Sequence, residues 1–336
     1  MIDFLCEWGQ VSNLKTALRQ VEATREIGAT HGKWQIFHPS RLVGPEAKRY
    51  WNKELGGAES QRDMFDELGC LTEGEWRQVA RACHDAGVQF MATPFDLEAV
   101  DLLEGLGVSS YKIASGDLPY KPLIERVAET GKKVYLSTGA ATPEEIFDTA
   151  RWLEGCDVVA MACDLVYPCD TTDSSIDQQM TVLRRMERMY ADVTAWPVVG
   201  LGYSDHTREV ITGAVAVALG ARTLEKHITL DKSRGTPDDL MALTVTEATA
   251  YLKAANDAAE IVEPARGDPQ APARIGARRS AHAAINLPAG HRLTDADVSW
   301  LRPCPEGSIT PAKGATGKTL VRPIAAGQRI KTDDIA

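Results

Sequence analysis

Short apolar runs alternate along the chain with longer amphipathic stretches, and this alternation predicts parallel βα units. The expected strands are residues 2–8, 33–37, 89–95, 111–115, 133–138, 158–164, 198–205 and 223–228. Stretches such as 72–87 and 142–155 have apolar residues at helical spacing and end in glycine, as helix C-termini prefer. Thr142 to Glu145 form an expected capping box with proline at the first helical position.

Eight βα units in about 260 residues predict a closed (β/α)8 barrel, the TIM barrel. An open doubly wound sheet is the rival arrangement, but it does not need eight units, and no GxGxxG motif follows the first run. Residues 244–262 read as a closing helix. We therefore expect a barrel domain over residues 1–262.

One connection, residues 38–72, is too long for an ordinary loop between a strand and a helix. Long loops after barrel strands usually cover the active site. This segment is therefore predicted to be a lid that contains a short helix.

The sequence changes character after the barrel. Residues 263–277 are rich in proline, alanine and glycine and are predicted to be a linker. Residues 278–336 contain short strand-like runs, 280–286 and 320–324, between glycine turns. This small β-rich module is too short to be strongly stable alone, so we expect it to pack on another surface.

Composition excludes some classes of function. Of 336 residues, 44% are hydrophobic and 25% are charged, and the net charge is −10. Nucleic acid and anionic membrane surfaces call for a dense basic surface and are not expected partners. An anionic small substrate remains compatible with this charge, because a few basic side chains suffice to line one pocket.

The compartment is expected to be the cytoplasm. The N-terminus has no basic region before an apolar run, which argues against a signal peptide. No apolar stretch reaches the ~18 residues of a membrane helix. The seven cysteines are scattered, odd in number and without a CxxC pair, which is typical of reduced thiols.

Polar residues gather where the predicted strands end, which is where TIM barrels carry their active sites. His206 and His227 follow neighbouring strands, and two imidazoles there are able to bind one divalent cation. The alternative is that each histidine is an ordinary polar residue of the rim. A carboxylate near each ring in the sequence favours a metal, with coordination positions left for water and substrate.

A second group of strand-end residues predicts an anion pocket. Its members are two cations and three hydroxyl donors, namely Lys33, Lys112, Ser115, Ser137 and Ser204. The alternative is that the lysines merely pair with Glu7, Asp117 or Glu225. Buried pairs of that kind cost desolvation and are more frequent at functional sites than in plain cores.

Five motifs then resemble one known family. QFMATPFD, KIASGD, LSTG, GYSDHT and EKHITLD occur in order on the expected strands and look like those of the sialic acid (N-acetylneuraminate) synthase family. The tail is similar to that family's antifreeze-like domain through RRS at 278–280, WLRP at 300–303 and the closing GQRIKTDDI. The resemblance covers nearly the whole chain.

The resemblance implies a reaction and a set of roles. The family condenses phosphoenolpyruvate with an N-acetylated hexosamine aldehyde and releases phosphate. It implies that His206 and His227 bind a metal, Mn2+ or Mg2+, and that Lys33, Lys112, Ser115, Ser137 and Ser204 bind phosphoenolpyruvate. Catalytic residues would be Glu7, Asp117 and Lys112, and the acceptor would contact Glu7, Gln35, Tyr167, Asp238 and Arg302. Arg302 would come from the partner in a domain-swapped homodimer.

The chain also departs from the family pattern. The first loop, EWGQVSNL, lacks the usual Asn-His pair, and Asp117 stands where glutamate is usual. Leu165, beside Asp164, replaces an asparagine or serine, and Asp239 replaces a histidine. These changes lie where the acceptor is expected, so the reaction type is a firmer expectation than the acceptor. A synthase or aldolase for another aldose or a sugar phosphate, or a sugar-binding homologue without activity, are the alternatives.

Overall fold

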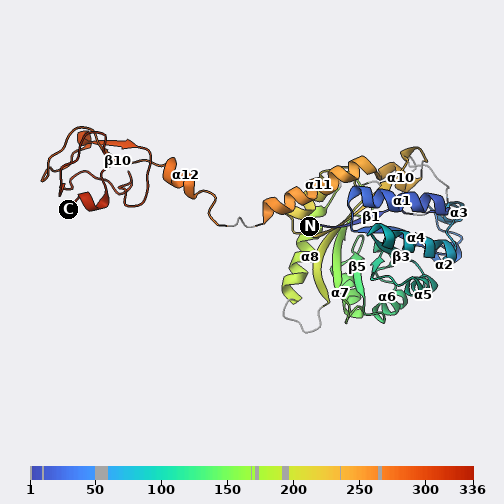
Figure 1. Cartoon of the computed structure of the whole chain (residues 1–336). Coiled ribbons are helices and arrows are strands. Elements are labelled where there is room, and N and C mark those ends of the chain that lie inside the picture. Colours follow the sequence, from blue (N-terminus) through green and yellow to red (C-terminus); the bar gives the residue numbers. More distant parts are fainter. Residues whose placement is uncertain are drawn as a thin grey trace. The chain divides into compact units, whose positions relative to one another are not determined.

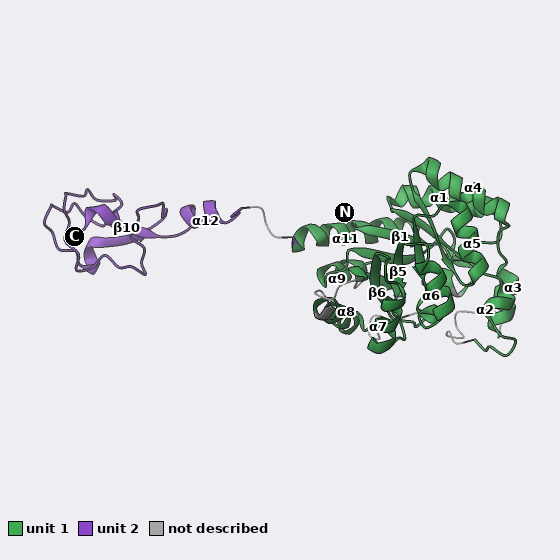
Figure 2. Cartoon of the chain, turned by 90° about the horizontal axis from the view of Figure 1, so that it is seen from below, with its two compact units in different colours: residues 1–262 green, residues 263–336 purple. Residues whose placement is uncertain are grey.

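The computed structural model describes residues 2–9, 11–49, 60–167, 169–170, 174–190, 197–234, 236–263 and 267–336. The chain divides into two compact units, residues 1–262 and residues 263–336 (Figure 2). Each unit has its own hydrophobic core, and each is described separately below.

The first unit is a nearly closed barrel of eight parallel strands surrounded by helices (Figure 1). The strands are β1 (Asp3–Glu7), β2 (His31–Ile36), β3 (Gln89–Pro94), β4 (Ser110–Ile113), β5 (Lys133–Ser137), β6 (Val158–Cys163), β7 (Val198–Asp205) and β8 (Thr223–Thr229). Their order is β3-β2-β1-β8-β7-β6-β5-β4. The end strands β3 and β4 contact each other, and the predicted (β/α)8 barrel is confirmed.

Two hydrophobic layers hold the barrel together. One lies between the strands and the outer helices and contains large side chains such as Trp34, which stacks on Phe90 with ring centroids 5.5 Å apart. The other lies inside the barrel. Its members come from β1, β3, β5 and β6 and are Leu5, Met91, Tyr135, Val159 and Met161. The interior is therefore a packed core and not a channel.

The described helices of this unit begin and end on recognisable signals. They are α1 (Leu14–Ile27), α2 (Pro39–Leu42), α3 (Gln61–Leu68), α4 (Glu73–Ala86), α5 (Leu97–Leu106), α6 (Lys121–Ala128), α7 (Pro143–Trp152), α8 (Ile176–Tyr190), α9 (Thr212–Ala218), α10 (Pro237–Met241) and α11 (Val245–Val262). The capping box predicted at Thr142 and Glu145 is present. A second one joins Thr72 and Glu75 at the start of α4. None of the helices described is long and apolar enough to cross a membrane.

Strand boundaries differ most from prediction at β2 and β4. β2 begins at His31, two residues before the predicted start, because Gly32 and His31 continue the ladder with β1 and β3. β4 ends at Ile113, and Ser115–Asp117 form a short 3-10 turn, η2. Ser115 and Asp117 therefore lie in the turn after the strand and not within it.

The long connection after β2 contains two short helices, α2 and α3, where one was predicted. Residues 50–59 of this segment lie outside the described part. Phe65 of α3 packs edge-on against Phe37 at the end of β2, with ring centroids 4.9 Å apart. This contact fixes α3 beside the C-terminal ends of the strands.

The second unit contains a helix, α12 (Ala271–Gly276), and an antiparallel pair, β10 (Ser280–Ala283) and β11 (Val298–Leu301). The predicted run 280–286 is thus shorter than expected. The predicted strand 320–324 is wrong. Leu320 and Ile324 make isolated bridges to Ile335 and Leu287, because the segments cross at single points around a small apolar core.

Candidate active site

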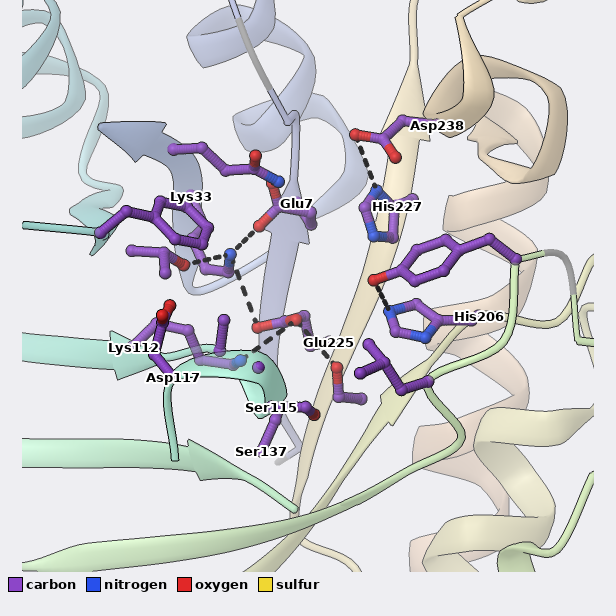
Figure 3. A pocket seen from close by; sticks show the side chains of 18 of the residues that line it. Glu7, Lys33, Lys112, Ser115, Asp117, Ser137, His206, Glu225, His227 and Asp238 are labelled. Atoms are coloured by element: carbon purple, nitrogen blue, oxygen red, sulfur yellow. Dashed lines mark hydrogen bonds and ion pairs between the residues drawn. The ribbon is translucent and has the colours of Figure 1, made fainter. Parts of the chain in front are cut away.

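A cavity of about 510 Å³ opens at the C-terminal ends of the barrel strands (Figure 3). Side chains alternate between the two faces of a strand, so the inward polar residues of this cavity stand two positions beyond the apolar residues that fill the barrel. On β1 the pair is Leu5 and Glu7, and on β5 it is Tyr135 and Ser137. The cavity floor is therefore a polar layer that rests on a hydrophobic one.

A chain of buried charges crosses this floor (Figure 3). Lys33 forms an ion pair with Glu7, and its Nζ donates to Thr93 Oγ1 at 2.9 Å. Glu225 lies between the two lysines, with its oxygens 3.9 Å from Lys33 Nζ and 3.7 Å from Lys112 Nζ. Burial alone would raise the pKa of Glu225, but Lys112 and Lys33 outweigh it and lower the pKa. Burial lowers the pKa of Lys33 to about 7, against the opposing carboxylate of Glu225.

The three predicted serines surround this chain of charges. Ser204 Oγ donates to Glu225 Oε1 at 2.9 Å, and Ser115 Oγ accepts the Gly139 N–H at 2.9 Å. Ser137 Oγ is buried with no hydrogen-bond partner in the described structure. A side chain at position 139 would stand 2.9 Å from Ser115 Oγ, so glycine is required for this close approach. The two lysines and three serines that were predicted to bind an anion thus line one cavity.

The two predicted metal-binding histidines also face the cavity, with ring centroids 5.4 Å apart. The Asp164 carbonyl accepts from His206 Nδ1 at 2.8 Å, and Tyr167 Oη lies 3.2 Å from Nε2. His227 Nδ1 is buried, has no hydrogen-bond partner among the described residues, and lies 3.9 Å from Asp238 Oδ2.

These rings fit a divalent cation. A buried imidazole nitrogen without a hydrogen-bond partner, next to a carboxylate, is a suitable ligand for a metal ion. The described residues contain no group of three His, Cys, Asp or Glu side chains arranged around one point. A metal here would therefore complete its coordination with water or substrate.

Asp205 adjoins His206 in the sequence, but its carboxylate does not orient the His206 ring. Asp205 points to the outside of the barrel, where Thr207, Thr212 and Tyr251 donate to it and Lys226 pairs with it at 3.0 Å. Adjacent residues of a strand face opposite sides of the sheet, so the side chains of Asp205 and His206 point in opposite directions. Burial works against the imidazolium of His206, but Cys163 and the Asp164 carbonyl raise its pKa to about 8.

The predicted acceptor and catalytic residues of the barrel line the same cavity. Gln35 Nε2 donates to Glu7 Oε1 at 3.2 Å, which joins the two side chains. Asp117 stands at the edge, and burial raises its pKa to about 6 although Lys112 opposes the shift. Arg302 belongs to the second unit, where it is exposed.

Two departures have a different role from the one expected. Asp239 does not line the cavity. It is buried in the first turn of α10, where Thr229 and Thr236 donate to its carboxylate, so it stabilises that turn. Asp164 turns its carboxylate towards α8. Leu165, in contrast, does line the cavity.

Some site residues were missed by sequence reasoning. Glu225 shares a strand face with His227 in the sequence pattern, but the sequence assigns it no role beyond pairing with a lysine. Cys163 also lines the cavity, two residues beyond inward-facing Met161. The lid contributes an apolar wall, and no motif marked it. Its residues are Leu42, Val43, Met64, Phe65 and Leu68.

Comparison with known proteins identifies the family. The NeuB family model matches residues 20–267, and the SAF domain model matches residues 278–336. The chain belongs to the NeuB family. The resemblance seen in the motifs and the expected antifreeze-like domain are thereby confirmed.

Two curated relatives and one solved structure illustrate the similarity. The N,N'-diacetyllegionaminic acid synthase of Campylobacter jejuni is 29% identical, over 92% of this chain and 89% of its own. Human N-acetylneuraminate-9-phosphate synthase is 27% identical, over 76% and 68%. The N-acetylneuraminic acid synthetase of Leptospira borgpetersenii superposes with a TM-score of 0.68 at 23% identity, over 81% and 88%, and supports the fold. The NeuB-family chain is thus an enzyme of the sialic acid synthase type, a phosphoenolpyruvate-dependent transferase.

Proposed function

We propose that this enzyme catalyses a metal-dependent condensation of phosphoenolpyruvate with an uncharged sugar aldehyde, giving a nonulosonic acid and phosphate. The observation that carries the proposal is the meeting of Lys33, Lys112 and the pair His206 and His227 in one cavity. An anion pocket beside a candidate metal pair is what a reaction between an enol phosphate and a carbonyl needs.

Phosphoenolpyruvate would bind where the lysines and serines converge. Lys33 and Lys112 offer ammonium groups to its carboxylate and phosphate, and Ser137 offers a buried hydroxyl that has no other partner in the part of the chain that the structure describes. Glu225 holds the ammonium groups on either side of itself before the substrate arrives. The two ammonium groups are therefore in position before the substrate binds, and little reorganisation is required during the reaction.

His206 and His227 would hold the cation, Mn2+ or Mg2+. When bound, such an ion supplies a Lewis acid for the acceptor carbonyl. The remaining steps involve the substrates and the side chains of the protein. Carbon three of phosphoenolpyruvate attacks the aldehyde carbon, whose oxygen takes up a proton and becomes a hydroxyl, and water adds to carbon two. Asp117 or Glu7 takes one proton of that water. The hydroxyl left on carbon two loses its proton and becomes the keto group as the phosphate leaves by carbon–oxygen cleavage.

The acceptor side of the cavity favours an uncharged sugar over a sugar phosphate. Four carboxylates but only two ammonium groups line the described cavity, and both ammonium groups are already paired with carboxylates. The lid adds an apolar wall that suits acyl or methyl substituents. A second phosphate group would meet unfavourable charge there, which argues against the sugar-phosphate alternative.

A domain-swapped homodimer would bring Arg302 to the acceptor. The second unit from residue 278 onward has nine basic and five acidic side chains, a net charge of +4. The remaining 28 basic and 42 acidic side chains give −14. Opposite charge supports docking of this unit on a barrel, and its small core calls for such a surface.

Replacing His206 tests the function itself. Wild-type enzyme with Mn2+, phosphoenolpyruvate and N-acetylmannosamine is expected to release phosphate, and His206→Ala is expected to lose this turnover because one ligand is gone. Phosphate release and Mn2+ calorimetry provide the measurement, and His84→Ala on the exposed face of α4 is the control. Full activity of His206→Ala in metal-free buffer would contradict the proposal.

The pH dependence tests Asp117 as the base. Its carboxylate form predominates above its pKa of about 6, so kcat is expected to increase as the pH rises through that value. Asp117→Asn should remove this increase and lower kcat by ~10²–10⁴-fold, whereas Asp117→Glu should retain part of both. An unchanged profile in Asp117→Asn would assign the base to another group.

A matched pair of acceptors tests the choice of sugar. N-acetylmannosamine is expected to have at least a ~10-fold higher kcat/KM than its 6-phosphate, since about 1.4 kcal/mol of charge repulsion suffices for that ratio. Met64→Lys in the apolar wall should reduce the preference. Glu67→Gln makes the same change in charge on the exposed side of α3 and should leave it unaltered. Preference for the phosphorylated sugar would favour the alternative function.

Solution mass tests the dimer. Light scattering is expected to give twice the mass of one chain, and Arg302→Ala should raise the KM of the acceptor several-fold without changing that mass. Lys313→Ala, an equal loss of charge at an exposed site of the same unit, is the control. A monomer that is fully active would exclude a shared site.

A further inference from the structure

The loop that follows β6 has two sides. Leu165 and Tyr167 line the cavity. The carboxylate of Asp164, which comes first in this loop, is directed away from the cavity and towards the start of α8. One residue thus links the wall of the active site to a helix on the outside of the barrel.

The Asp164 carboxylate is held by α8 through several hydrogen bonds. Oδ2 accepts the backbone N–H of Ser175 at 3.0 Å, and Oδ1 accepts Gln179 Nε2 at 2.6 Å and the Ser175 hydroxyl at 2.5 Å. Gln179 also accepts the N–H of Cys163 at 2.5 Å. A carboxylate at the first turn of a helix is further stabilised by the helix dipole. Residues 163 and 164 are therefore clamped to α8.

The backbone of Asp164 acts on the active site. Its carbonyl oxygen lies 2.8 Å from His206 Nδ1. A carbonyl only accepts, so Nδ1 carries a proton, and in the neutral imidazole the lone pair is therefore on Nε2. Nε2 is the nitrogen that lies beside Tyr167 in the cavity. The carbonyl of Asp164 thus sets both the tautomer and the direction of the ring.

We propose that Asp164 is the positioning residue of His206. Its side chain clamps the loop to α8, and the clamp holds the carbonyl that presents His206 Nε2 to the cavity. A hydrogen-bond partner behind a ligating histidine commonly contributes ten- to hundredfold to metal affinity. The role assigned to the metal rests on the proposed function, but the control of the ring itself does not.

Asp164→Ala and Asp164→Asn test this role in the full-length enzyme. At a pH above the pKa of about 8 of His206, where the ring is neutral, we expect metal-free ¹⁵N NMR of the histidine rings to show His206 losing its fixed Nδ1–H form in Asp164→Ala. Mn2+ affinity by calorimetry should fall ~10-fold or more. In Asp164→Asn the amide oxygen still accepts from α8, so both readouts should return most of the way to wild type.

Asp177→Ala is the matched control, because it removes an exposed acidic side chain from the same first turn of α8. It is expected to change stability slightly and to leave His206 and Mn2+ binding unaltered. A folded Asp164→Ala protein with an unchanged His206 spectrum would overturn the proposal. If wild type binds no Mn2+, the proposed function fails on that point, and the NMR comparison still decides the role of Asp164.

Discussion

The burial of charge at the top of the barrel is the constraint on which the rest of the site depends. Lys33, Lys112, Glu7 and Glu225 are nearly inaccessible to solvent, and isolated charges there would cost several kcal/mol each. They are tolerated because each ammonium has a carboxylate and each carboxylate has a further donor. Removing one partner would leave the other uncompensated, so the four positions are energetically linked.

This energetic linkage explains why the site residues at the strand ends could be predicted from the sequence. A lysine or glutamate inside an apolar run is costly unless it is paired, and the even spacing of strand residues shows which of them share the inner face. The barrel, its eight strands and the meeting of Lys33, Lys112, His206 and His227 therefore followed from local pattern. The antifreeze-like domain was recognised only from its motifs, since its single-point bridges leave little periodicity.

What escaped sequence reasoning depends on contacts between distant segments. Asp205 adjoins His206 in the chain, yet it faces Lys226 behind the barrel. Asp239 was expected near the acceptor, yet it lies in α10, where two threonines donate to its carboxylate. The apolar wall on α2 and α3 was not foreseen, because the prediction of a lid did not say which side of a short helix faces inward. In each case the direction of a side chain, and not its type, was decisive.

The position of the lid has a consequence for how such an enzyme diversifies. The apolar wall belongs to an excursion between β2 and α4 whose described part includes no barrel strand, whereas the lysines, serines and histidines are attached to the strands or the turns beside them. Substitutions in the excursion are thus free to reshape what the cavity accepts while the ladder of the barrel is untouched. Part of the wall that a substrate meets is therefore separate from the strands that carry the charged groups, and natural selection is able to alter that part without rebuilding the barrel.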